Sequence, residues 1–495
     1  MIPFDQLLKE FIQTKHISIA AMINHTKIDR STVYKYIGGK RIPSSEHVKL
    51  LASFMNLTPK EEEDFFEAYH ILKIGEDVFY QRKNVEDFIL NFPQPAKDRQ
   101  EYQGLFARET ASAMSPCSSE KIFKALHTSM EINNCVCHLL LRETHKQQGK
   151  IALFLQPDYD FLFCLLSAAL SPKSAVEISH IFCLSNALQF TSDHKLYNLL
   201  YLEEILPVFM NALDYHVFYY YDNLDSHFHN FNGFPCFILT EDEAILCTAD
   251  YQSGIFIREK DTVSMLWKIF EDYKEKCRPL FQTIDSVAEE CEILGNLDWY
   301  ASQTYVLQSE ACLIPFITDE MLSKYIILNK EEKQKLLPFI KSFIASRKST
   351  LSNENMRIYH TQKGVLDFLA SGRLLEIGDD FYHPFSLSDR FGLLHSLYSH
   401  LSLGYSFLLQ GNLKELPHNF HLCVNASVGY LLFLDCYGKQ NYLLFREPVF
   451  LSIFLDYLAS LDEKHLCSRE EYQSYLEKVL ADSPVKTALM HKSQK

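Results

Sequence analysis

The chain has 495 residues, which is too long for a single hydrophobic core, so two or three domains are expected. Hydrophobic residues make up 47% and charged residues 22% of the chain, proportions that argue against a disordered protein. The net charge of -15 argues against a protein that coats nucleic acid along its whole surface.

The charge is unevenly distributed along the chain. Residues 1–60 carry nine lysines and arginines against four acidic residues, whereas the rest carries 39 basic and 59 acidic residues. A small basic end on a long acidic body is typical of a protein that contacts DNA locally, although chance clustering would give the same counts.

Residues 1–90 have the pattern of consecutive short helices. Ser18 and Asp29 are predicted to cap a second and a third helix, since their side chains can accept hydrogen bonds from free backbone N–H groups. Gly38 and Gly39 are expected to end the third helix, and later helices begin after Ser44-Ser45 and Thr58-Pro59. Five apolar residues at helical spacing define the first helix: Phe4, Leu7, Leu8, Phe11 and Ile12.

The segment 28–44, IDRSTVYKYIGGKRIPS, resembles the lambda-repressor-like (XRE) family of helix-turn-helix regulators. The similarity covers about residues 4–70, and it lies in the Arg-Ser-Thr opening of the third helix and the Gly-Lys-Arg-x-Pro-Ser that follows it. It implies that the third helix lies in the major groove of DNA. Lys40 and Arg41 would then contact phosphates, as would Ser18 near the start of the second helix.

The residues of the third helix fit that role by themselves. A helix that begins at Arg30 places four residues outward and Val33, Tyr36 and Ile37 inward. Arginine and lysine can reach guanine atoms in the major groove, and hydroxyl groups can contact bases or phosphates. The candidate DNA-binding residues are Ser18, Arg30, Ser31, Thr32, Tyr34, Lys35, Lys40 and Arg41.

Two positions depart from the family pattern. Ile23 stands where a small alanine is usual, and Lys27 stands where the turn usually has glycine. A lysine in a left-handed turn costs roughly 1 kcal/mol relative to glycine. The turn between the second and third helices is therefore expected to differ in shape, which affects the groove contacts more than the fold.

A break follows this region at residues 91–100, where Pro93 and Pro95 prevent helix continuation. We expect a DNA-binding domain at 1–90, a linker at 91–100 and an α/β domain at 101–347. A polar stretch at 348–357 is expected to separate a second α/β part at 348–495.

The body has the pattern of an α/β fold with a mixed sheet. Helical segments alternate with six runs that predict strands: 150–156, 175–184, 216–222, 236–242, 244–250 and 254–259. Residues 236–259 also resemble residues 421–447, and each segment is followed by an apolar helix, with a shift of about four residues between strands and helix. The similarity indicates either an internal duplication or a common local unit.

The same strand and helix order resembles one half of the phospholipase D-like fold. Catalysis in that family uses His-x-Lys followed four residues later by an acid. The His-x-Lys sequences here, such as His47-Val48-Lys49, lie in the DNA-binding region, with no acid at that place. The resemblance therefore implies a body without this activity.

No other catalytic or nucleotide-binding motif is present, so we expect no enzyme activity, no cofactor and no metal. Cys135 to His138 reads Cys-Val-Cys-His but lacks a second ligand pair. The aromatic run Phe218 to Tyr221 fits either a buried strand or the wall of a ligand pocket. If the body were an enzyme, its site would be sought at His216, Asp222, Asp225, His227 and His229.

The cysteines and the apolar runs indicate where the protein works. The 13 cysteines follow no disulfide framework and mostly fall in apolar runs, which predicts free thiols in a reducing compartment. Without a signal-peptide pattern or an apolar run of about 18 residues, we expect a cytoplasmic protein with no membrane partner.

Together these features predict a sequence-specific transcriptional regulator that binds double-stranded DNA as a homodimer. Its C-terminal region would sense a small-molecule or peptide effector, or mediate oligomerisation. Two other functions are compatible with the sequence. One is an enzyme with an appended helix-turn-helix, and the other is a protein interaction module that does not bind DNA.

Overall fold

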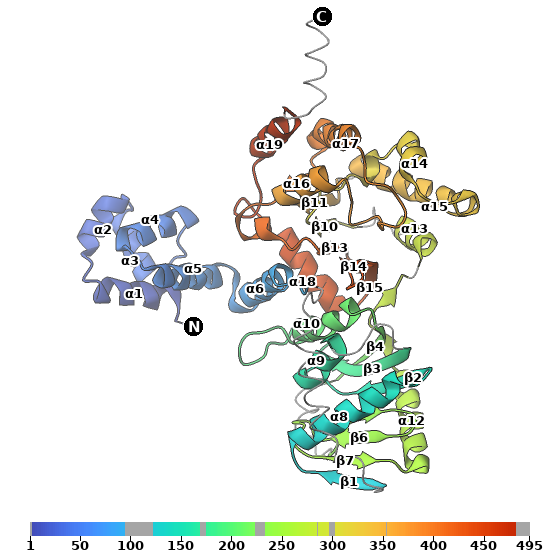
Figure 1. Cartoon of the computed structure of the whole chain (residues 1–495). Helices are drawn as coiled ribbons and strands as arrows, with labels where there is room; N and C mark the ends of the chain where they lie inside the picture. Colours follow the sequence, from blue (N-terminus) through green and yellow to red (C-terminus); the bar gives the residue numbers. More distant parts are fainter. Residues whose placement is uncertain are drawn as a thin grey trace, which may run out of the picture. The chain divides into compact units, whose positions relative to one another are not determined.

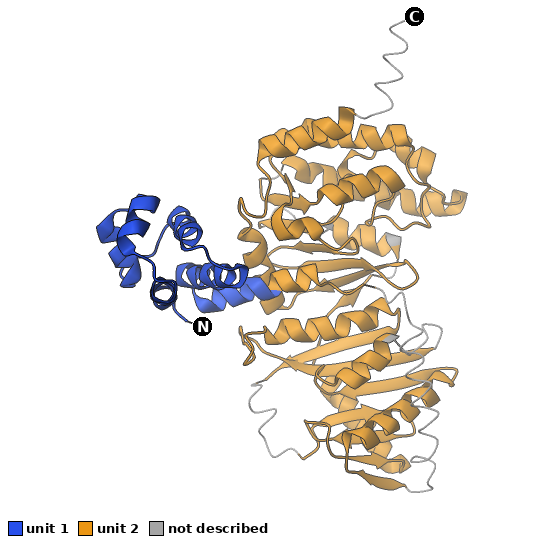
Figure 2. Ribbon diagram, turned by 60° about the vertical axis from the view of Figure 1, so that its left-hand side comes forward, with its two compact units in different colours: residues 1–84 blue, residues 85–495 orange. Residues whose placement is uncertain are grey.

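The structure is a computed structural model that describes residues 2–94, 122–168, 175–222, 233–284, 286–296, 302–352 and 354–481. The chain forms two compact units, residues 1–84 and residues 85–495, and the boundary falls inside one helix (Figure 2). The first unit is helical and the second combines helices with two mixed sheets, so the predicted multidomain α/β fold class is confirmed.

The first unit consists of short helices around one small core. Leu8, Val33, Val48 and Phe65 are fully buried in it and come from four different helices. The helices are α1 (Phe4–Thr14), α2 (Ile19–Thr26), α3 (Arg30–Ile37), α4 (Ser45–Met55), α5 (Pro59–Ile74) and the first part of α6 (Glu76–Leu90).

The helix starts that the sequence predicts are observed. Ser18, Asp29, Ser44 and Thr58 are the N-caps of α2 to α5, and each side chain accepts a hydrogen bond from the backbone N–H three residues later. Lys27 ends α2 in the left-handed region, with φ of 58°. The short turn from Lys27 to Asp29 therefore keeps the backbone that a glycine would adopt, at a cost of roughly 1 kcal/mol.

The first half of the body, residues 123–279, contains an eight-stranded sheet in the order β1-β7-β6-β5-β2-β3-β4-β8 (Figure 1). Strands β2, β3 and β4 are parallel, and the other pairings are antiparallel. All six strands predicted from the sequence are present. The elements are β1 (Phe123–Leu126), α8 (Ser129–Thr144), β2 (Gly149–Phe154), α9 (Asp160–Ala168), β3 (Val176–Leu184), α10 (Tyr197–Met210), β4 (Asp214–Tyr221), β5 (Cys236–Leu239), β6 (Ala244–Cys247), β7 (Gly254–Ile257), α12 (Lys260–Lys274) and β8 (Arg278–Pro279).

The second half, residues 282–481, contains a seven-stranded sheet in the order β12-β11-β10-β13-β14-β15-β9. Four short 3-10 helices connect its elements: η1 (Ile314–Phe316), η2 (Thr350–Ser352), η3 (Leu401–Leu403) and η4 (Gly411–Glu415). The other elements are β9 (Gln282–Thr283), α13 (Val287–Asn296), β10 (Thr304–Gln308), α14 (Asp319–Tyr325), α15 (Lys330–Ser349), β11 (Met356–His360), α16 (Gln362–Ser371), α17 (Leu387–His400), β12 (Ser406–Leu408), β13 (His421–Val424), β14 (Gly429–Leu434), β15 (Gln440–Phe445), α18 (Pro448–Ala459) and α19 (Arg469–Ala481).

The two halves repeat one topology. Strands β10, β11 and β12 are parallel like β2, β3 and β4, and β13, β14, β15 and β9 pair antiparallel like β5, β6, β7 and β1. The hairpins β5–β6 and β13–β14 have turns of equal length, because Leu239 pairs with Ala244 and Val424 pairs with Gly429. The similarity seen between residues 236–259 and 421–447 thus reflects a repeated unit, in which β8 is an addition to the first copy.

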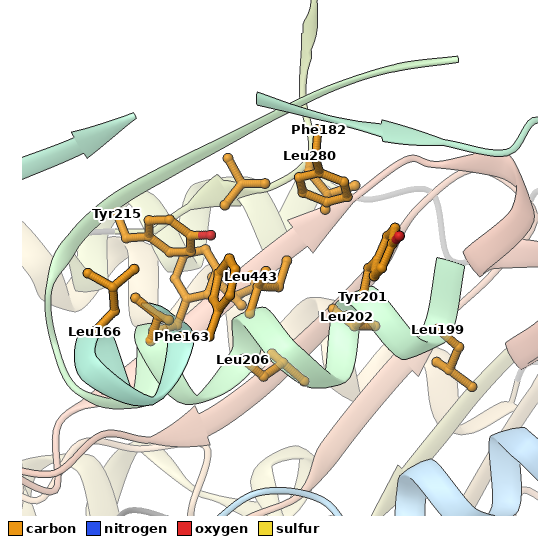
Figure 3. Packing of buried hydrophobic residues seen from close by; sticks show 14 of the residues in the cluster. Phe163, Leu166, Phe182, Leu199, Tyr201, Leu202, Leu206, Tyr215, Leu280 and Leu443 are labelled. Atoms are coloured by element: carbon orange, nitrogen blue, oxygen red, sulfur yellow. The ribbon is translucent and has the colours of Figure 1, made fainter. Parts of the chain in front are cut away.

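The two halves stack in layers and share one core. Helix α12 covers one face of the first sheet. Helices α10 and α18 lie between the two sheets (Figure 1), and the buried residues of α8, α9, α10 and α18 form one cluster with both sheets. Figure 3 shows Leu443 of β15 packed near Leu206 of α10 and Phe163 of α9. The remaining helices of the second half cover the outer face of the second sheet.

The change from one sheet to the other corrects the predicted division of the body. Residue 348 lies within α15, whereas the sheets change between Pro279 and Gln282. The polar stretch at 348–357 instead ends a helix that covers the second sheet. Of the predicted linker, residues 95–100 lie outside the described residues, and Phe92 is buried against Phe420 and Phe433.

Candidate nucleic-acid interface

Helix α3 has one buried and one exposed face, as the sequence predicts. Val33 and Tyr36 are buried in the core of the first unit. Arg30, Tyr34 and Lys35 are exposed, and the guanidinium of Arg30 lies over the Tyr34 ring, 5.7 Å from its centre. The helix therefore presents a cation, an aromatic hydroxyl and a second cation to solvent.

The basic residues of the first unit fall into two groups. Between residues 18 and 49, six basic side chains stand against two acidic ones, and none of the six forms an ion pair with a residue that the structure describes. They are Lys27, Arg30, Lys35, Lys40, Arg41 and Lys49. In contrast, four lysines outside this segment are paired with acids: Lys9, Lys15, Lys60 and Lys83.

This difference decides which cations can bind an anion. A lysine that already contacts a carboxylate must give up that contact before it binds phosphate, whereas an unpaired cation releases only solvent ions. The unpaired cations lie on α3, on α4 and in the turns that precede α3 and follow it. Lys27 and Lys49 are not among the DNA-binding residues predicted from the sequence, although their place in this basic segment points to them.

Asp29 is the acidic residue closest to the start of α3. Its carboxylate accepts hydrogen bonds from the Ser31 hydroxyl at 2.6 Å and from the backbone N–H of Thr32 at 3.1 Å. These hydrogen bonds, led by that of Ser31, lower the pKa of Asp29, so the carboxylate stays ionised. Ser31 thus donates its proton within the protein, and Thr32 is half-buried behind the cap. Both are poorer contacts for a base than Arg30 or Lys35.

The remaining predicted contacts lie beside α3. Lys40 and Arg41 are exposed just after Gly39, which has a φ of 67° and lets the chain turn away from the helix end. Ser18 is exposed, and its hydroxyl accepts a hydrogen bond from the backbone N–H of Ala21 at 3.4 Å. That hydroxyl retains its proton for donation to a phosphate.

The candidate chemical sites of the body are divided by the structure. Cys135 and Cys137 are buried in α8. His216 pairs with Asp214 at 2.9 Å, whereas Asp225, His227 and His229 lie outside the described residues. Asp222 is exposed at the end of β4. Among the described residues, no group of three or more His, Cys, Asp or Glu side chains could hold a metal ion.

The aromatic run from Phe218 to Tyr221 forms most of strand β4. Tyr219 is buried, and Phe218, Tyr220 and Tyr221 are half-buried. Phe218 and Tyr220 pack with the cluster beneath α12, and Tyr219 belongs to the core between the sheets. The run is therefore mainly a core strand.

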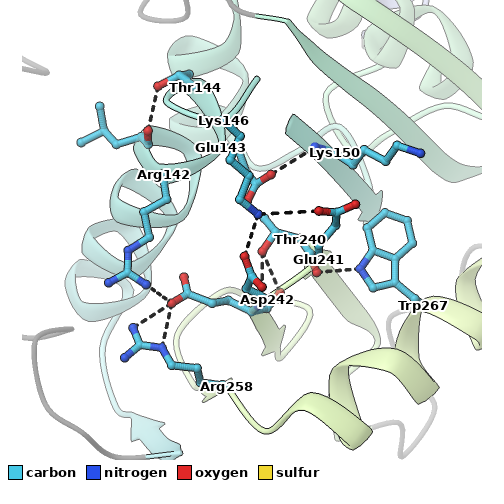
Figure 4. Close-up of polar contacts among 12 residues, drawn as sticks. Arg142, Glu143, Thr144, Lys146, Lys150, Thr240, Glu241, Asp242, Arg258 and Trp267 are labelled. Atoms are coloured by element: carbon cyan, nitrogen blue, oxygen red, sulfur yellow. Dashed lines mark hydrogen bonds and ion pairs between the residues drawn. The ribbon is translucent and has the colours of Figure 1, made fainter. Parts of the chain in front are cut away.

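The most charged cluster of the first half surrounds the β5–β6 turn (Figure 4). Glu243 is buried and forms ion pairs with Arg142 and Arg258, and its contact with the second guanidinium is 2.7 Å. Lys146 contacts Glu143 at 2.8 Å and Asp242 at 2.7 Å. The buried acids of this cluster, Glu143 and Glu243, each have a cation beside them. The cluster therefore holds the turn in place, and both buried carboxylates are already paired.

Comparisons with known proteins give no family. No family model matches the sequence, and no curated protein matches it. Among solved structures, TrmBL2, an archaeal chromatin protein whose structure shows a novel mode of DNA binding, is 11% identical and covers 55% of this chain and 98% of its own, with a TM-score of 0.22. A polyphosphate kinase from Porphyromonas gingivalis is 11% identical and covers 92% and 66%, with a TM-score of 0.22. At these TM-scores neither likeness supports an argument about fold or function.

Among the described residues, no helix is long and apolar enough to cross a bilayer.

Proposed function

We propose that the first unit binds double-stranded DNA and that the protein is a transcriptional regulator. The observation that carries this proposal is the set of six cations on α3, on α4 and in the turns before and after α3, none of which forms an ion pair with a described residue. In this arrangement α3 enters the major groove, and Arg30 and Lys35 reach base edges. Lys40, Arg41 and Ser18 contact phosphates and set the register.

The body supplies the regulation in this proposal. A homodimer brings two copies of α3 to half-sites one helical turn of DNA apart, or a multiple of it. A small-molecule or peptide effector that binds the body changes the spacing of the two copies and so changes affinity. We propose no catalytic role for the body, and its resemblance to the phospholipase D-like fold stays a prediction. Analytical ultracentrifugation with and without operator DNA tests the dimer, which a strictly monomeric protein in both conditions would contradict.

Fluorescence anisotropy of the full chain on duplex DNA from its own upstream region tests the DNA-binding proposal. We compare wild type with an Arg30→Ala, Lys35→Ala double variant at two salt concentrations. The double variant is expected to lose about 10-fold or more in affinity for the preferred duplex, and the salt dependence of binding becomes shallower.

A matched control removes two cations from the same unit that already have acidic partners. In Lys9→Ala, Lys60→Ala the lost lysines are those that contact Asp5, Glu63 and Asp64. This variant is expected to bind DNA as wild type does. Equal binding by wild type and both double variants would contradict the proposal and favour a protein partner for α3.

A further inference from the structure

The helices on the outer face of the second sheet enclose an apolar cavity of about 80 Å³. Helices α13, α14 and α15 and the segment 376–385 line it. The enclosed space is roughly half of an engineered cavity of about 150 Å³ that holds benzene. Half-buried apolar side chains at the rim give it access to solvent: Met321, Ile326, Leu328, Ile340, Ile344 and Phe381.

Two carboxylates are the charged groups among the lining residues. Glu290 of α13 is buried and accepts a hydrogen bond from the Tyr442 hydroxyl at 2.6 Å. Glu376 is half-buried and forms no hydrogen bond or ion pair with any residue that the structure describes. A carboxylate without a partner at an apolar cavity is costly, and a ligand that brings a donor removes that cost.

The two tyrosines of the cavity wall are already engaged. The Tyr382 hydroxyl accepts a hydrogen bond from the backbone N–H of Leu374 at 2.6 Å. The Tyr325 hydroxyl donates to Asp389 and accepts from the backbone N–H of Ser386 at 2.9 Å. The carboxylates are therefore the charged groups that a ligand can use, and the Tyr382 hydroxyl keeps a proton to donate.

The charge around the cavity favours a single positive charge in the ligand. Arg347 is buried nearby, donates to the Tyr430 hydroxyl at 3.0 Å and attracts both carboxylates. Burial raises the pKa of both acids, to about 7 for Glu290, and Arg347 opposes the rise. An ammonium group that donates hydrogen bonds to these acids favours their ionised form, whereas a second carboxylate or a phosphate would disfavour it.

The stacking of the two halves explains why such a site exists in the second half. The corresponding helices of the first half, α8 to α10, pack into the core that the two sheets share. Helices α13 to α17 cover the face of the second sheet that points away from the first sheet (Figure 1). A cavity in this layer can therefore open to solvent.

We propose that this cavity binds a primary ammonium group carried on a short alkyl chain, with Glu376 and Glu290 as the anchoring carboxylates. The chain occupies the apolar space and the ammonium donates hydrogen bonds to the carboxylates. Such a group occurs in a free alkylamine and in a lysine side chain of a peptide. The binding site stands on the cavity alone, and its role as the effector site rests on the proposed function.

Calorimetric titration of the full chain with three ligands of equal size tests the site at about pH 8. Butan-1-amine is expected to bind at least about 10-fold more tightly than butan-1-ol, and butanoate is expected not to bind. In Glu376→Gln the amine loses about 10-fold in affinity while the alcohol is unaffected. Nα-acetyl-lysine methylamide distinguishes the two sources, because only a peptide-type site binds it more tightly than butan-1-amine.

A volume control keeps the test independent of charge. Ile344→Phe fills the cavity from its rim and is expected to abolish binding of both amine and alcohol, with the thermal midpoint unchanged or raised. Equal affinity for amine and alcohol, an unchanged amine affinity in Glu376→Gln, or no binding of any ligand would each overturn the proposal. DNA affinity without ligand is measured separately, so failure of this site does not count against the DNA-binding unit.

Discussion

The two halves of the body share one topology but keep their buried charges in different ways. In the first half the buried acids Glu143 and Glu243 each have a cation within 3 Å, Lys146 for one and two arginines for the other. In the second half, Glu290 and Glu310 are held by single neutral donors, the Tyr442 hydroxyl and the backbone N–H of Leu375. The same strand order therefore supports acids paired with cations in one copy and buried acids held by neutral donors in the other.

The largest effect expected when the two halves are compared is on the free energy of unfolding at low pH, through their buried histidines. Burial lowers the pKa of His180 in the first half to about 4, and of His360 and His421 in the second half to about 3. The unfolded chain binds protons on these histidines below about pH 6.5, and the folded chain does not. The stability that they contribute is present above about pH 6.5 and is lost as the pH falls toward 3, by about 3 kcal/mol for His180 and about 5 kcal/mol each for His360 and His421.

Urea unfolding between about pH 4 and 7 measures this loss in wild type and in two sets of variants. We expect His360→Gln, His421→Gln to flatten the pH dependence of the unfolding free energy about twice as much as His180→Gln does. An equal slope in all three proteins would show that these histidines are not kept neutral by the fold.

A second effect concerns Glu310 and has the opposite sign. Burial raises its pKa to about 8, so the folded chain holds a proton that the unfolded chain releases above about pH 4.5. Stability from this group is present below about pH 4.5 and is lost as the pH rises through 8. Glu310→Gln should therefore match wild type below about pH 5 and exceed its unfolding free energy by about 5 kcal/mol near pH 9. The exposed Glu463→Gln serves as control and should leave the pH dependence unchanged.

Local residue patterns were enough to predict the first unit and the strands of the first half. Caps such as Asp29 and the alternation around Val33 act within a few residues, so they can be identified in one sequence. The division of the body and the cavity could not be predicted in this way. They depend on pairings between distant segments, such as Glu290 with Tyr442, which no local pattern encodes.

Equivalent helix caps give a smaller contrast between the halves. Glu447 and Glu259 cap α18 and α12, and each accepts a hydrogen bond from the backbone N–H three residues later. Glu447 is buried and also accepts from the Tyr221 hydroxyl of the first half at 2.7 Å. Glu447→Ala should lower the unfolding free energy by about 2 kcal/mol, because two donors lose their acceptor. Glu259→Ala should cost less, since water can reach its N–H groups, and equal losses in the two variants would contradict this contrast.

The smallest expected effect comes from one pair of side chains that differs between the two hairpins. Gly429 of β14 pairs with Phe445 of β15, where the first half pairs Ala244 with Ile257. A Cβ on Gly429 would lie 2.4 Å from the Phe445 ring, so Gly429→Ala should cost about 1 to 2 kcal/mol in urea unfolding.

The double variant Gly429→Ala, Phe445→Ile rebuilds the pair of the first half and separates this clash from other causes. Removing the ring alone should cost about 2 kcal/mol, because Phe445 packs against Phe450 and Phe454 in the shared core. Once the ring is gone, the added methyl group should cost nothing, so the double variant is expected to be about 1 kcal/mol more stable than the sum of the two single losses. Strict additivity would mean that the glycine is required by the strand backbone and not by the neighbouring ring.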